Sequence, residues 1–209
     1  MWTIITAAAG ALVGLILMRN LATLRYRRPD ERELPKPPQA WWLIPALAVV
    51  WGWLTWRHQE QPWPVVVLWL PLAAALGWLS AVDLKVRRLP DAVMLPTAGW
   101  VTAILAAHAI TTDSPTPAFL TAAIGAAVGA AAWILHLASR GAFGFGDVKL
   151  VAVLSAAVAL VSPALVLPAL FASCLVAIAV SLVTRRREFA FGPSLAVGCV
   201  LAVGLASLT

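Results

Sequence analysis

An aspartate and a lysine open an apolar run in the stretch Gly141-Ala-Phe-Gly-Phe-Gly-Asp147-Val-Lys149-Leu150, where three glycines precede the acid. The apolar residues continue over about 148–161. An ionisable group at a membrane segment costs enough free energy to mark a functional site by default. Glycines beside it allow another chain to approach the backbone closely. Asp147 is therefore the first candidate site residue.

The composition is that of a membrane protein. Of the 209 residues, 62% are apolar and 11% are charged, whereas an average soluble domain is about a quarter charged. The net charge of +6 does not indicate nucleic acid, because the basic residues lie in loops between apolar runs and no basic face with interleaved aromatic residues exists. We expect the lipid bilayer as a partner and no nucleic acid.

Eight apolar runs predict an all-α, polytopic bundle of about eight transmembrane helices. They cover approximately 2–18, 41–56, 65–82, 92–110, 118–138, 148–161, 164–184 and 190–208. With alternating directions and the first helix ending inside, fourteen of the fifteen Lys and Arg residues are cytoplasmic and only Arg57 is outside. This positive-inside pattern predicts a multi-pass protein of the cell membrane with both termini outside.

Residues 19–40 predict a short cytoplasmic linker with no core of its own, because they contain six basic residues, three acidic residues and four prolines. The basic cluster follows the first apolar run, whereas a signal peptide carries its charge before the run. We therefore expect a retained first helix, and a single membrane-embedded domain over 1–209.

A second acid, Asp83, ends the apolar run 65–82. In the predicted topology its helix runs inward and the helix that Asp147 opens runs outward, so both carboxylates lie at the cytoplasmic face. Two carboxylates at one depth can share a proton and hold a water, as acid–base peptide hydrolysis requires. Either acid alone is more often a solvated or paired group at a helix end. The shared face and the neighbouring glycines favour a site.

Three motifs resemble those of the type IV prepilin peptidase (leader peptidase) family, the GxGD-type intramembrane aspartic proteases. They are Asp83-Leu-Lys-Val-Arg-Arg-Leu89-Pro90-Asp91, Gly144-Phe-Gly146-Asp147-Val-Lys149-Leu150 and Phe191-Gly192-Pro193, in this order within about 79–198. The resemblance implies that Asp83 and Asp147 are the catalytic pair of an aspartic endopeptidase. It also implies a type IV prepilin or pseudopilin substrate of a type IV pilus or protein secretion pathway. Such a substrate has a short basic leader that ends in glycine, followed by an apolar helix of about 20 residues, and is cut after the glycine at the cytoplasmic face. Asp91 is interpreted as a helix-start residue after proline.

The resemblance further implies that Gly144 and Gly146 bind the substrate, whose extended backbone lies against the glycine loop. For Lys149, also a candidate substrate-binding residue, two interpretations are open. Its ammonium stabilises the ionised acid, or it extends to the membrane interface.

Longer bacterial members of this family have a zinc-binding methyltransferase domain with paired CxxC motifs between the first two helices. Residues 19–40 contain no cysteine, so the chain resembles a short form that trims prepilins without methylating them. Cys174 and Cys199 lie in separate apolar runs and are expected to be buried packing residues. The three histidines show no ligand spacing, and we predict no metal and no cofactor.

The competing interpretation is a non-enzymatic membrane transporter or assembly scaffold that uses the two acids as a proton relay or as ion pairs. Transporters often contain repeated halves with helices broken at mid-membrane. The sequence shows no such repeat, and both acids lie at a predicted membrane edge. The peptidase interpretation is therefore favoured.

Overall fold

The computed structural model describes residues 1–31, 33, 35–60, 64–140, 143–184 and 190–206. Within these ranges the chain forms eight α-helices, and no strand. They are α1 Trp2–Ala22, α2 Leu43–Arg57, α3 Pro64–Val86, α4 Asp91–Thr111, α5 Thr116–Ala138, α6 Phe145–Val161, α7 Val166–Thr184 and α8 Gly192–Leu205, with 3₁₀ turns η1 Pro29–Glu31 and η2 Pro163–Leu165. The predicted helical fold class is confirmed. Gly141 and the predicted cytoplasmic residues Arg185, Arg186 and Arg187 lie outside the described residues.

Five segments are long and apolar enough to cross a membrane, namely α1, α3, α4, α5 and the continuous segment Pro163–Thr184 that contains α7. The other three helices are shorter, with 15 residues in α2, 17 in α6 and 14 in α8. At a rise of ~1.5 Å per residue, none of these three reaches the ~30 Å of a typical hydrocarbon core when straight. The chain is a multi-pass membrane protein.

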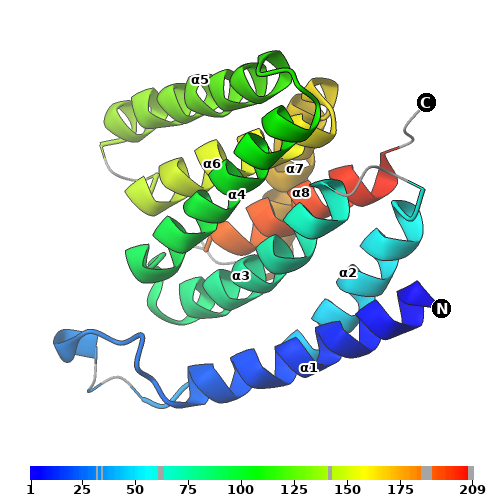
Figure 1. The fold of residues 1–209 in the computed structure, drawn as a ribbon. Helices are drawn as coiled ribbons and strands as arrows, with labels where there is room; N and C mark the ends of the chain where they lie inside the picture. Colours follow the sequence, from blue (N-terminus) through cyan, green and yellow to red (C-terminus); the bar gives the residue numbers. More distant parts are fainter. Residues whose placement is uncertain (32, 34, 61–63, 141–142, 185–189, 207–209) are drawn as a thin grey trace.

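The two central helices are α3 and α8, which lie between the α1–α2 hairpin and the group formed by α4, α5 and α6 (Figure 1). Leu68, Trp69 and Leu72 of α3 are fully buried in the main apolar core. The start of α1 and the end of α8 lie at one end of the bundle, and the connection between α1 and α2 lies at the opposite end (Figure 1). The same opposite end contains the last turn of α3 and the first turn of α6.

Helices α1 and α2 approach each other closely at Gly10 and Gly14. A Cβ atom at either glycine would lie 2.5 Å from a carbonyl oxygen of α2, that of Leu47 or of Leu43. Such small-residue surfaces let helix backbones come close enough for extensive van der Waals contact. Gly10 and Gly14 therefore pack α1 against α2 within one chain.

Gly125 and Gly129 do the same for the α5–α6 pair, because a Cβ at Gly129 would lie 2.7 Å from the Cβ of Ala152. Gly129→Val is therefore expected to lower the free energy of unfolding by about 1–3 kcal/mol through overpacking. The measurement is thermal unfolding in detergent, followed by circular dichroism. Ala127→Val is the matched control because Ala127 is exposed on the same helix. An equal loss of stability in both variants would contradict the packing role.

The predicted linker packs against the bundle through contacts of Tyr26 and Glu31. The Arg88 guanidinium, just after α3, pairs with the Glu31 carboxylate at 3.0 Å and donates to the Tyr26 carbonyl oxygen at 3.1 Å. The Tyr26 ring packs edge-on against Trp78 of α3. Hydrogen bonding from Arg88 holds the pKa of Glu31 below its usual range, which favours the ionised carboxylate.

Cys199 is buried as predicted, but the prediction was wrong for Cys174, which is exposed. The inward face of α7 contains Ala169, Ser173 and Ala177. Cys174 follows Ser173 and is therefore rotated by about 100° around the helix, away from this face. Apolar sequence alone does not distinguish the two faces, because the lipid-facing side of a membrane helix is apolar as well.

Candidate active site

Asp83 lies in the last turn of α3 with only 6% of its surface exposed. The backbone N–H of Gly192, at the start of α8, donates to Asp83 Oδ2 at 3.1 Å. The first N–H groups of a helix have no partners within the helix and favour negative charge. The predicted run ended just before Asp83, whereas α3 continues to Val86. Asp83 is therefore held inside a helix rather than beyond its end.

Asp147 lies in the first turn of α6, after the helix-capping residue Gly144. Its carboxylate lies against this glycine, since a Cβ at Gly144 would be 2.9 Å from Asp147 Oδ2. Asp83 is near enough for its charge to act on Asp147. The structure thus brings together the two acids that the sequence selected, from helices that α4 and α5 separate along the chain.

Leu89 and two glycines connect the three sequence motifs at this place. A Cβ at Gly146 would lie 3.1 Å from the Leu89 Cβ, and one at Gly192 would lie 3.5 Å from Leu89 Cδ2. The same added atom at Gly192 would lie 2.8 Å from Asp83 Oδ2. A side chain at Gly192 would therefore occupy the space beside the Asp83 carboxylate, and one at Gly146 would press against Leu89.

The segment before Asp147 is anchored on both sides. The Phe143 N–H donates to Ser139 Oγ at 3.1 Å, and its carbonyl oxygen contacts His136 Nδ1. The Phe143 ring packs edge-on against Phe191, with 5.7 Å between centroids. The end of α5, the glycine motif and the start of α8 are thus joined by direct contacts, which positions Gly144 and Gly192 on either side of the site.

Lys149 pairs with Asp91 rather than with a buried acid. Its Nζ lies 2.7 Å from Asp91 Oδ1 and 4.9 Å from the centroid of the Phe145 ring. Asp91 is the first residue of α4, as its interpretation as a helix-start residue predicts. Both side chains are substantially exposed, 35% for Lys149 and 61% for Asp91, so the pair contributes about 0–1 kcal/mol. Binding of substrate by Lys149 stays a prediction.

Sequence reasoning gave no role to Gly192 or Leu89, although both belong to the quoted motifs. For Gly192 a signal exists, because a glycine before Pro193 at the start of an apolar run marks a helix start with free N–H groups. Its acceptor could not be found from the sequence, because Asp83 lies far away along the chain. Among the described residues no group of three or more His, Cys, Asp and Glu side chains could hold a metal ion.

The fold and the site define a helical membrane protein with a buried aspartate, Asp83, and a partly buried one, Asp147, at one end of its bundle. The chain belongs to the type IV leader peptidase family, whose family model matches residues 70–182, more than half of the chain. This region begins in α3 and ends in α7, and so contains Asp83 and Asp147 but not Gly192. No curated protein and no solved structure matches the chain.

Proposed function

We propose that the protein is an aspartic endopeptidase of the cytoplasmic membrane that removes the leaders of type IV prepilins or pseudopilins. The observation that carries this proposal is the convergence of Asp83, which is buried, and Asp147, which is partly buried, at the same end of the bundle and each next to a glycine. Membership of a peptidase family supports it. A structural role alone would not require two like charges to be placed near each other in a low-dielectric interior.

In the proposed reaction the two carboxyl groups share one proton and hold a water between them. The ionised carboxylate removes a proton from the water, and the water oxygen forms a bond with the peptide carbonyl carbon. When the tetrahedral intermediate breaks the C–N bond, the protonated carboxyl gives its proton to the departing amine. The pair then again carries one proton, so no other acid or base is needed.

Gly144 and Gly146 are proposed to bind the substrate backbone. A peptide in extended form offers N–H and carbonyl groups to a neighbouring main chain, provided that no side chains keep the two apart. Both glycines lie within three residues of Asp147. The scissile peptide bond can therefore be bound directly beside the carboxylates.

Incubation of purified protein with a prepilin is expected to release the leader by a single cut after its glycine, with no methyl group added to the new N-terminus. The linker of residues 19–40 contains no cysteine and could not fold as a zinc-binding methyltransferase. Mass spectrometry of the product, with and without S-adenosylmethionine, measures both points. Absence of any cut would contradict the peptidase proposal, and donor-dependent methylation would contradict the short-form assignment.

We also propose that the site faces the cytoplasm, as the distribution of basic residues indicates. In a Cys174→Ser background, a Thr112→Cys variant should be labelled by an impermeant maleimide applied to intact cells, and a Lys36→Cys variant should not. Both positions are exposed in connections between helices. Labelling in the reverse pattern would place both aspartates outside the cell and would exclude cytoplasmic cleavage.

A further inference from the structure

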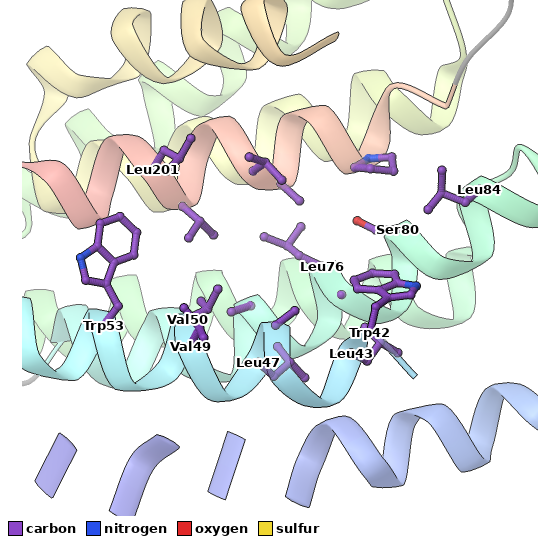
Figure 2. Close-up of a pocket in the computed structure, with 17 residues that line it drawn as sticks. Trp42, Leu43, Leu47, Val49, Val50, Trp53, Leu76, Ser80, Leu84 and Leu201 are labelled. Carbon is purple, nitrogen blue, oxygen red and sulfur yellow. The ribbon is translucent and has the colours of Figure 1, made fainter. Parts of the chain in front are cut away.

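An apolar groove of about 670 Å³ runs along the bundle between α2, α3 and α8 (Figure 2). Its walls are almost entirely aliphatic and indole side chains, with the Ser80 hydroxyl at one end. Trp53 and Leu201 lie at the other end (Figure 2). Along α3 the lining extends from Ala73 to Leu84, a length of about 17 Å at ~1.5 Å per residue.

The end of the groove at Trp53 is closed. The Trp53 indole packs directly on Gly204, where any added Cβ would collide with the ring. Beyond it, Arg57 donates to the Ala206 carbonyl oxygen at 2.9 Å and His58 Nε2 lies 3.0 Å from the Val203 carbonyl oxygen. These contacts hold α2 against α8 at the end of the bundle that contains the start of α1.

The opposite end of the groove lies next to Asp83. Ser80, Leu84 and Pro193 line it there. Asp83 lies between the first two of these in α3, and Gly192, the donor to Asp83, immediately precedes the third. Asp83 follows Leu76 by seven positions and is therefore only about 20° from this lining residue around the helix. The carboxylate is thus at the border of the groove-lining face.

We infer that this groove binds the apolar helix that follows the scissile bond of the substrate, an inference that rests on the proposed function. A substrate cut just before an apolar helix must place that helix in the membrane and its first peptide bond at the aspartates. The groove meets both requirements, because it is apolar along its length and continuous with the site at one end. Its length along α3 corresponds to about 11 residues of helix.

The direct test is photocrosslinking. A benzoylphenylalanine replaces Val49 or Val197, which line the groove and are 67% and 45% exposed, in an Asp147→Asn background that retains uncut substrate. The probe is a synthetic prepilin segment with a basic leader ending in glycine and an apolar helix of about 20 residues. We expect adducts to the apolar helix at both positions and none at the exposed control position Ala127 on α5. Equal adducts at Ala127, or adducts to phospholipid alone at both groove positions, would overturn the inference.

A second measurement does not depend on crosslinking. Val197→Trp, which fills the groove, is expected to raise KM for the same segment by about tenfold with little change in kcat, since it removes binding common to ground and transition states. Ala127→Trp should leave both constants unchanged. An unchanged KM in a folded Val197→Trp protein would overturn the groove assignment while wild-type cleavage still supported the peptidase proposal. If the wild type does not cut any prepilin, the proposed function fails by itself, whatever the crosslinks show.

Discussion

Asp83→Asn and Asp147→Asn are each expected to lower the kcat for prepilin cleavage by at least about a thousandfold, since groups that act as a unit lose nearly all activity together. Asparagine is close to isosteric with aspartate but cannot exchange the proton that the reaction needs. In Asp83→Asn the amide oxygen can still accept the Gly192 N–H. Both variants should therefore insert and fold normally, which detergent-solution thermal unfolding measures beside the cleavage assay.

Asp113→Asn is the matched control, because Asp113 is exposed in the connection between α4 and α5. Its cleavage rate should equal that of the wild type. Near-normal cleavage by either the Asp83 or the Asp147 variant would mean that the substituted residue is not catalytic. Loss of cleavage in both well-folded aspartate variants, with the control unaffected, would support the peptidase and exclude a scaffold in which the acids only form ion pairs.

The second large effect is expected from single methyl groups. Gly144→Ala and Gly192→Ala should each reduce kcat by about a hundredfold, since a misplacement of catalytic groups by ~1 Å has an effect of this size. The added Cβ would lie 2.9 Å from Asp147 Oδ2 in one variant and 2.8 Å from Asp83 Oδ2 in the other. Gly144 has φ −66° and ψ 139°, which alanine adopts without strain. The kinetic constants for prepilin cleavage measure the effect.

Gly99 provides the control for this experiment, because a Cβ at this position in α4 would meet nothing within 4 Å. Gly99→Ala should retain full activity and gain roughly 0.5–1 kcal/mol of stability from the higher helix propensity of alanine. If the two site variants were as active as Gly99→Ala, the carboxylates would have to be displaced from the glycines in the reacting state. The site geometry described above would then be wrong.

The helices could be predicted from the sequence because long apolar runs leave few other structures in a bilayer. Their ends were less accurate where charged residues continue a helix beyond the apolar part. The run that ends before Asp83 illustrates this, because the helix includes Asp83, Lys85 and Val86. Apolarity reports contact with lipid or core, whereas the helix ends where backbone hydrogen bonding ends.

The acidic pair could also be predicted, because both acids stand at membrane edges and the alternation of helices places them on one face. The partner of Lys149 could not be predicted. Lys149 is two positions from Asp147 in sequence, but residues at this spacing point to different sides of a helix. Its observed partner Asp91 is on α4. Contacts between helices depend on how the helices pack, which a single sequence specifies only indirectly.

The hydrogen bond from Gly192 to Asp83 has a consequence for biosynthesis. A chain is made from its N-terminus, so both aspartates enter the membrane before α8, the last of the described helices, has left the ribosome. Until then Asp83 lacks the N–H donor that the finished site supplies. The apolar groove also lacks its α8 wall until that moment. A nascent or prematurely terminated chain that lacks α8 therefore lacks part of the proposed active site and one wall of the groove.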